Sequence, residues 1–225
     1  MRELRSRVHQ EVSTVVMGQT PALDALLAAV AVGGHVLLEG IPGTAKTLLA
    51  NAFAKAVGVE FSRAQFTPDM LPSDLTGTMT LRGGDLVFRP GPVFSNVLLA
   101  DEINRTPPKT QSALLEAMAE NQVSVDGTTH ELPSPFMVVA TQNPVEYEGT
   151  YPLPEAQLDR FLMKIEVGYP EADQELEMLR MSRDGVRPTA IDEVVAVTGA
   201  DELLAMRDQI SDLRIEDDVL DYLAK

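Results

Sequence analysis

The stretch Gly40-Ile41-Pro42-Gly43-Thr44-Ala45-Lys46-Thr47 determines the predicted fold, because it is typical of a loop that holds a phosphate chain. An apolar run at 35–38 precedes it and predicts a buried parallel strand, and 48–56 predicts a helix with an apolar stripe. Strand, small-residue loop and helix together form the context of a P-loop, in which backbone N–H groups and the helix N-terminus converge on phosphates. The residues expected to contact a nucleotide here are Gly40, Pro42, Gly43, Thr44, Ala45, Lys46, Thr47 and Leu48.

Two side chains of this loop have predicted roles, and a third residue departs from the usual pattern. Lys46 is expected to reach the β- and γ-phosphates, and the hydroxyl of Thr47 to hold Mg²⁺. Ala45 stands where a second glycine is usual. Alanine is expected to be tolerated there if its φ is negative, because it adds only a methyl group.

Composition excludes several other classes of protein. The chain has 225 residues, 44 % of them hydrophobic, which is enough for one large domain or for one domain with a small appendage. It has no cysteine, so disulfides and thiolate metal sites are excluded, and its three widely spaced histidines form no ligand pattern. The start of the chain lacks the apolar core of a signal peptide, and the apolar run at 25–38 is too short to span a bilayer. A cytoplasmic protein without membrane insertion is therefore expected.

The charge balance argues against nucleic acid as a partner. Formal net charge is −16, and residues 171–225 carry 15 acidic against 6 basic side chains. Binding to nucleic-acid backbones rests on clustered Lys and Arg, which this chain lacks. An acidic protein can still hold ATP, because the phosphate-binding loop supplies its own local positive field.

Two adjacent carboxylates end a second apolar strand, predicted at 97–100. Asp101 is expected to hold the Mg²⁺ shell, and Glu102 to polarise a water molecule for attack on the γ-phosphate. Both can line one crevice, because the chain turns at the end of a strand. Without the phosphate-binding loop, the pair would be read as a helix cap beside a solvated glutamate.

Later segments add two candidates. Thr141-Gln142-Asn143-Pro144 follows a third buried strand at 136–140, and Asn143 is preferred over Thr141 as the side chain that orients water or contacts the γ-phosphate. Arg160 precedes a weaker strand at 162–167, where it could insert into a neighbour's nucleotide site or form an ordinary surface ion pair.

The remaining pattern predicts two domains. Residues 1–170 form the nucleotide-binding core, with hairpins at 77–89 and 123–130, and helices at 2–15, 22–32 and 109–120. Residues 171–225 shift to acidic helices near Pro170 and are expected to be the start of a helical lid that the chain truncates.

Four motifs, in this order, resemble the MoxR-like branch of the AAA+ ATPases. They are G-x-P-G-x-A-K-T (40–47), L-L-A-D-E-I-N-R (98–105), A-T-Q-N-P (140–144) and L-P-E-A-Q-L-D-R-F (153–161), and the stretch 66–77 strengthens the resemblance. It covers roughly the whole chain, and Ala45 is usual in that branch. The resemblance implies that Asn143 is sensor 1 and that Arg160 is an arginine finger acting in trans. It also implies that Gly18-Gln19 packs near the adenine and that Arg105 lies at a subunit interface.

The resemblance further implies an assembly and a class of partner. A ring is expected, with six subunits when the lid is complete, and with both hairpins on the face toward the pore or a partner. The implied activity is chaperone-like remodelling, often beside proteins with a von Willebrand factor A domain. One expected feature is missing, because no Gly-x-x-Arg that could act as sensor 2 follows residue 170.

The sequence therefore predicts an α/β P-loop core with a parallel sheet and part of a helical lid, which hydrolyses ATP with Mg²⁺ and remodels a protein. A small-molecule kinase is one alternative, although the Asp-Glu pair suits activation of water. A DNA-translocating motor is another, although the predicted hairpin tips are not basic. A nucleotide switch that does not hydrolyse is disfavoured by Glu102.

Overall fold

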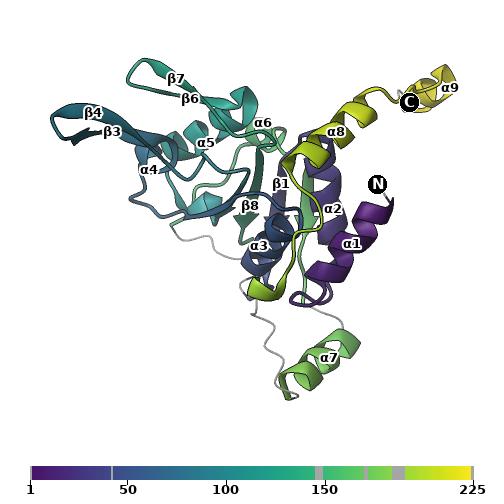
Figure 1. Ribbon diagram of the computed structural model, residues 1–225. Coiled ribbons are helices and arrows are strands. Elements are labelled where there is room, and N and C mark those ends of the chain that lie inside the picture. Colours follow the sequence, from purple (N-terminus) through teal and green to yellow (C-terminus); the bar gives the residue numbers. More distant parts are fainter. Residues whose placement is uncertain (1, 42, 145–148, 170–171, 184–190, 224–225) are drawn as a thin grey trace.

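A five-stranded parallel sheet forms the centre of the computed structural model, which describes residues 2–41, 43–144, 149–169, 172–183 and 191–223 (Figure 1). Every pair of neighbouring strands is parallel, as the predicted P-loop core requires. In spatial order the strands are β2 (Phe61–Gln65), β5 (Val97–Asp101), β8 (Met137–Gln142), β1 (Val36–Glu39) and β9 (Met163–Glu166). The carboxyl ends of β1, β5 and β8 therefore meet at one edge of the sheet, where ligands bind in folds of this type.

Helices cover both faces of the sheet, which explains why its strands are continuous apolar runs. Successive strand residues point to opposite faces, so Val97 and Leu99 pack in one apolar cluster and Leu98 and Ala100 in the other. The first cluster includes side chains of α1 (Arg2–Val12), α2 (Thr20–Val32) and α3 (Lys46–Ala56), and the second includes those of α5 (Pro108–Glu120).

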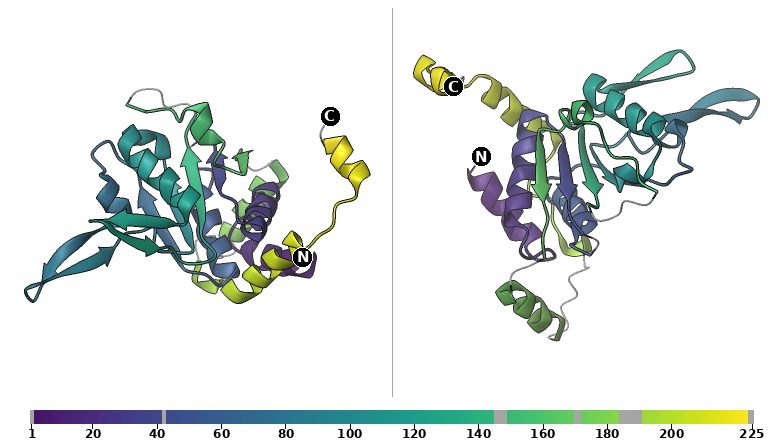
Figure 2. Two further views of the ribbon diagram at one scale, coloured as in Figure 1. Left: turned by 90° about the horizontal axis from the view of Figure 1, so that it is seen from above. Right: turned by 180° about the vertical axis from the view of Figure 1, so that it is seen from behind.

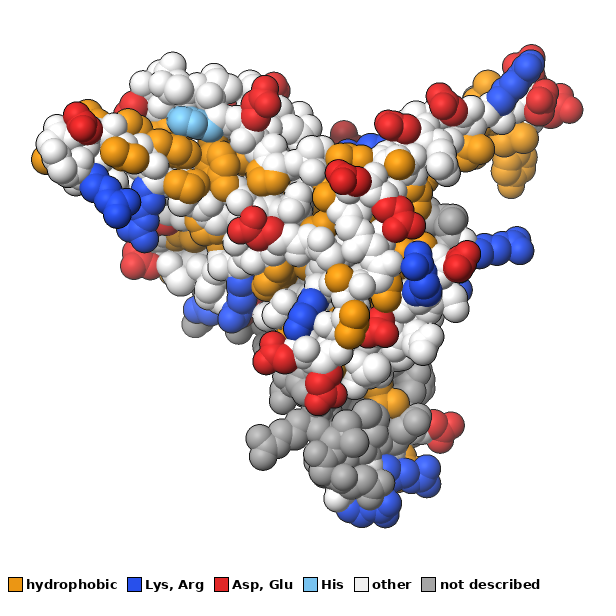
Figure 3. Space-filling view, viewed as in Figure 1, with side chains coloured by type: hydrophobic (Ala, Val, Ile, Leu, Met, Phe, Trp, Pro, Cys, Tyr) orange, Lys and Arg blue, Asp and Glu red, His pale blue; other side chains and the backbone are white. Residues whose placement is uncertain are grey.

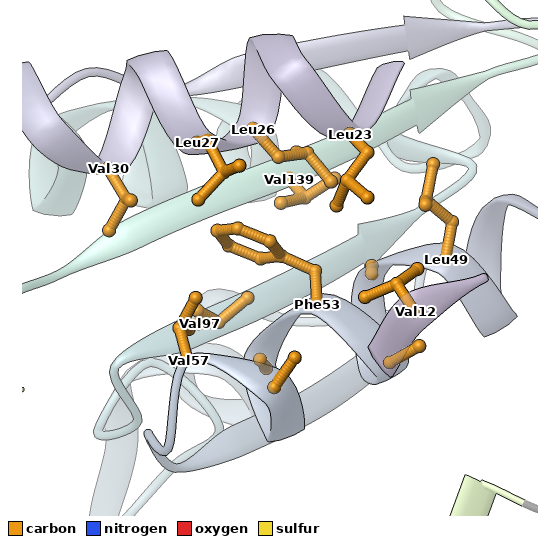
Figure 4. Packing of buried hydrophobic residues seen from close by; sticks show 14 of the residues in the cluster. Val12, Leu23, Leu26, Leu27, Val30, Leu49, Phe53, Val57, Val97 and Val139 are labelled. Carbon is orange, nitrogen blue, oxygen red and sulfur yellow. The ribbon is translucent and has the colours of Figure 1, made fainter. Parts of the chain in front are cut away.

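Phe53 fixes α3 against the sheet. Its ring is fully buried and points between α2, which carries Leu26 and Leu27, and the strand residues Val97 and Val139 (Figure 4). Burying such a side chain stabilises the fold by about 1.5–3 kcal/mol. Because α3 begins at Lys46, this packing also fixes the phosphate-binding loop that precedes it.

His35 has the structural role that its isolated position predicts. It is 6 % exposed, and its Nδ1 accepts a hydrogen bond of 3.0 Å from the N–H of Val138 on β8. Nε2 must then carry the ring proton, which it donates to the carbonyl oxygen of Met118 on α5 at 3.1 Å. The neutral ring thus joins α5 to the sheet.

Two hairpins project from the side of the sheet that carries α5 (Figure 1). They are β3 (Gly77–Arg82) with β4 (Asp85–Pro90), and β6 (Gln122–Val125) with β7 (Thr128–Glu131). The rings of Phe88 and His130 stack with their centroids 3.9 Å apart and so connect the two hairpins. Hydrophobic side chains gather along this projection (Figure 3). Leu81 and Leu86, which pair in the β3–β4 hairpin, are both exposed.

The segment after residue 190 returns to the core. Val194 is 2 % exposed and Leu203 is 1 % exposed, and both belong to the same cluster as Phe53. The guanidinium of Arg207 donates to the carbonyl oxygen of Val30, at the end of α2, at 3.1 Å. This segment holds the short η2 (Ile191–Glu193), α8 (Ala200–Ser211) and α9 (Asp217–Leu223), and α7 (Ala172–Arg183) precedes it.

Helix α9 stands away from the sheet in every view, and α7 does so in Figure 1 and in the right-hand view of Figure 2. The boundary predicted near Pro170 lies outside the described residues, and the division into core and lid stays a prediction. Among the described helices, none combines the length and the apolar character needed to cross a bilayer.

Each helix and strand predicted from the sequence is present, with its ends shifted by a few residues. The short elements α4 (Pro72–Thr76), η1 (Ile103–Arg105) and α6 (Glu155–Leu158) complete the chain. Helices of three to five residues span about one turn, so apolar periodicity does not predict them.

Candidate nucleotide-binding site

Two cavities meet along the loop between β1 and α3. One has a volume of about 420 Å³ and is lined by Lys46, Thr47, the ends of β5 and β8, and two side chains of β2. The other, of about 540 Å³, is lined mainly by Val15, Val16, Met17, Leu48 and Tyr169. Gly43, Thr44, Ala45 and Leu48 line both cavities. A polar cavity beside an apolar one matches the phosphates and the base of a nucleotide.

Lys46 lies folded over the loop. Its Nζ donates to the carbonyl oxygens of Gly40 and Ile41, each at 2.7 Å. Burial lowers the pKa of Lys46, and the nearby carboxylates of Asp101 and Glu102 oppose that shift. Gly40 is needed at its position, because a Cβ there would collide with the carbonyl oxygen of Val167.

Ala45 does not have the negative φ under which alanine was expected to be tolerated at this position. Its φ is 59° and its ψ is 22°, the left-handed conformation that favours glycine. An L-residue there costs roughly 1–2 kcal/mol. The expectation is wrong because the turn into α3, and not the residue type, sets this backbone angle. Pro42, which was also expected to contact the nucleotide, lies outside the described residues.

Asp101 is buried among hydrogen-bond donors. The Thr47 hydroxyl lies 3.4 Å from Oδ2, and the Thr141 hydroxyl donates to Oδ1 at 2.6 Å. Arg63 on β2 donates to Oδ2 through Nη2 at 2.6 Å and through Nε at 3.1 Å. Thr47 and Asp101 thus face one another with a hydroxyl and a carboxylate. Mg²⁺ uses such oxygen donors, usually one or two from protein beside phosphates and water, so the pair fits this ion.

Glu102 directly follows β5 and has a strained backbone. Its φ is 58° and its ψ is 52°, and its N–H donates to the Thr141 hydroxyl at 2.8 Å. One carboxylate oxygen, Oε2, accepts from Gln65 at 2.7 Å and from Arg105 at 3.0 Å. Non-glycine residues in this conformation cluster at functional sites, where the surrounding structure fixes them.

The other predicted residues divide between this site and other places. Asn143 is 6 % exposed and lines the polar cavity, and Gln19 lines the apolar one. Gly18 lines a third cavity of about 200 Å³ beside it. Arg160 lies elsewhere, lining a cavity of about 280 Å³ that shares no lining residue with the polar cavity, and it donates to the carbonyl oxygen of Leu115 at 3.0 Å.

Comparison with known proteins agrees with this geometry. Residues 35–163 match the ATPase family associated with various cellular activities (AAA). Chaperone MoxR1 of Mycobacterium tuberculosis is 48 % identical over 217 residues, which are 96 % of this chain and 56 % of MoxR1.

The chain belongs to the MoxR-like branch of the AAA ATPases.

Two further proteins resemble this chain over nearly its whole length. YeaC of Bacillus subtilis is 45 % identical over 227 residues, which cover all of this chain and 70 % of YeaC. The crystal structure of a candidate ATPase from Cytophaga hutchinsonii is 47 % identical, with a TM-score of 0.87 over 99 % of this chain and 68 % of that one. As a MoxR-like ATPase, the chain binds a nucleotide and hydrolyses ATP.

Three side chains contact the carboxylates of this site in ways that the sequence motifs do not predict. Arg63 and Gln65 contact the two carboxylates from β2, and Thr141 contacts both Asp101 and the N–H of Glu102. A signal for the first two exists in the sequence, because polar residues two apart on a strand point to the same side. It becomes readable only once β2 is known to pair with β5, with Gln65 opposite Asp101.

Proposed function

We propose that the chain hydrolyses Mg²⁺-bound ATP at the polar cavity and that assembled subunits use this reaction to remodel a protein client. The observation that carries the proposal is that Lys46, Thr47, Asp101 and Glu102 all line one cavity. The cavity thereby brings together side chains that can bind phosphates and a base that can take a proton from water.

The proposed reaction is attack of water on the γ-phosphorus. Glu102 accepts a proton from the water molecule while the oxygen of that water bonds to the γ-phosphorus. The bond between the γ-phosphorus and the oxygen that bridges it to the β-phosphate breaks, which releases ADP. Lys46 stabilises charge on the β- and γ-phosphates, and Asn143 orients the water or the γ-phosphate. Mg²⁺, held through Thr47 and Asp101, would neutralise charge on the same oxygens.

Several features support a role in remodelling within a ring. The relative from M. tuberculosis is named a chaperone, and this chain spans 56 % of it, so activity on a client is a proposal here. The projecting hairpins offer exposed apolar side chains to a client or a pore. Because Arg160 lies apart from its own chain's polar cavity, we propose that it completes the site of a neighbour.

The finer points of assembly, partner and location stay predictions. We propose a hexamer as the ring and a von Willebrand factor A domain protein as one candidate partner. The cytoplasmic location and the absence of a nucleic-acid partner likewise stay predictions.

The test separates binding from metal use. Lys46→Ala should weaken ATP binding by about 10- to 100-fold, because a charge-assisted contact contributes roughly 1.5–3 kcal/mol. Asp101→Asn should instead raise the Mg²⁺ concentration needed for half-maximal ATPase rate. Calorimetry with ATP and a Mg²⁺ titration of turnover measure the two effects, with Lys55→Ala on the far end of α3 as the control. Unchanged ATP affinity in Lys46→Ala would place the nucleotide elsewhere.

A further inference from the structure

A buried glutamine connects the turn after Glu102 with another segment. Gln111 lies on α5 and is 1 % exposed. Its Nε2 lies 3.2 Å from the carbonyl oxygen of Ile103, 3.1 Å from that of Thr106 and 2.9 Å from that of Tyr151. Two of these oxygens belong to the turn after Glu102, and the third belongs to the segment after β8. One side chain therefore donates to two separate parts of the backbone.

The turn that Gln111 contacts is the strained one. The N–H of Glu102 is held by the Thr141 hydroxyl at 2.8 Å, and its carbonyl oxygen accepts from the N–H of Arg105 at 2.9 Å. The next carbonyl oxygen, that of Ile103, is held by Gln111. A left-handed non-glycine residue persists only where the surrounding structure fixes it on both sides. Gln111 supplies part of that fixation on the C-terminal side.

Water cannot easily replace Gln111 at this place. Ile103 and Thr106 are both 0 % exposed. A buried carbonyl that loses its donor retains the cost of desolvation, so the backbone shifts toward a new partner. Because Glu102 directly precedes Ile103, a shift of the backbone at Ile103 moves the Glu102 carboxylate relative to Lys46 and Thr47.

We propose that Gln111 is a positioning residue for hydrolysis, which holds the Glu102 carboxylate where it can take a proton from water. The inference rests on the proposed role of Glu102 as the base. Gln111 does not line the cavity at Lys46, so it acts on turnover and not on nucleotide contacts. A displacement of about 1 Å can reduce a catalysed rate up to about 100-fold.

The experiment compares Gln111→Met with Thr110→Val. Methionine keeps the length of the side chain and removes its donor. Thr110 is the matched control, because it is the adjacent residue on α5, is 2 % exposed, and donates at 2.8 Å to the carbonyl oxygen of Met70, away from the Glu102 turn. Gln111→Met should lower kcat at least ~10-fold while ATP affinity changes less than ~2-fold. Thr110→Val should keep the parent kcat, although both variants lower the midpoint of thermal unfolding.

Three outcomes overturn the inference: the parent kcat in folded Gln111→Met, an equal loss of kcat in Thr110→Val, or a loss of ATP affinity that matches the loss of kcat. If Gln111→Met does not fold, Gln111→Asn withdraws the amide by one carbon and should show the same split. Glu102→Gln separates this inference from the proposed function. If Glu102→Gln is inactive while Gln111→Met turns over normally, only the inference about Gln111 fails.

Discussion

Two residues at the site, Ala45 and Glu102, adopt left-handed backbone conformations although neither is glycine. The motifs around them predict Lys46 and Asp101, because those roles follow from side-chain chemistry at a fixed spacing. The backbone angles are not predictable in this way, since the turn into α3 and the hydrogen bonds after β5 impose them. Strain at such positions is a property of the folded chain.

The strain at Ala45 predicts an unusual response to glycine. Ala45→Gly should raise the free energy of unfolding by about 0.5–1 kcal/mol, because relief of the left-handed alanine exceeds the added freedom of the unfolded chain. Ala50→Gly, the same change inside α3, should lower it by about 1 kcal/mol or more. Denaturant unfolding measures both. If Ala45→Gly lowered the free energy of unfolding as much as Ala50→Gly does, the left-handed conformation assigned to Ala45 would be contradicted.

At the level of elements, apolar periodicity predicts the strands and long helices, but it does not predict their order in the sheet. The contacts of Arg63 with Asp101 and of Gln65 with Glu102 depend on β2 lying beside β5. That order depends on contacts between segments far apart in the sequence, such as those in the clusters around Phe53 and Leu114, which no local pattern contains. The motif residues of the site, such as Lys46 and Asp101, are therefore predictable from the sequence. Arg63 and Gln65, which contact the two carboxylates, are recognised only once the fold is known.

His35 makes the joint between α5 and the sheet sensitive to acid. Burial lowers its pKa below the ordinary value of 6.5, and the charge of Arg207 adds to the shift. The unfolded chain then binds a proton that the folded chain does not, so stability is full above pH 6.5 and falls as pH drops below it. Unfolding of the parent and of His35→Gln between pH 7.5 and about 5 tests this. The free energy of unfolding of the parent should fall toward that of His35→Gln as pH drops. A difference between the two that stays constant with pH would contradict the assigned role of His35.

At the level of the whole molecule, Arg160 lies apart from the polar cavity of its own chain. A complete site, as proposed above, therefore needs the cavity of one chain and Arg160 of another. If Arg160 acts on a neighbour, Arg160→Ala and Lys46→Ala chains should each be inactive alone. Mixed assemblies should recover part of the activity, because some intact Lys46 sites then face intact Arg160 side chains. Arginine fingers contribute about 10³–10⁵ in rate, so the recovery is easily measured by ATP turnover. Continued inactivity despite shown co-assembly would mean that Arg160 acts within its own chain or only structurally.

The most direct test of the account is the fate of ATP on Glu102→Gln in a single turnover with excess protein. Glutamine keeps the size of the side chain and its contacts near Gln65 and Arg105, but it cannot take a proton from water. We expect ATP to bind to Glu102→Gln with the parent affinity and to stay intact, with hydrolysis slowed about 10²–10⁴-fold. Formation of ADP at the parent rate would contradict the assignment of Glu102 as the base.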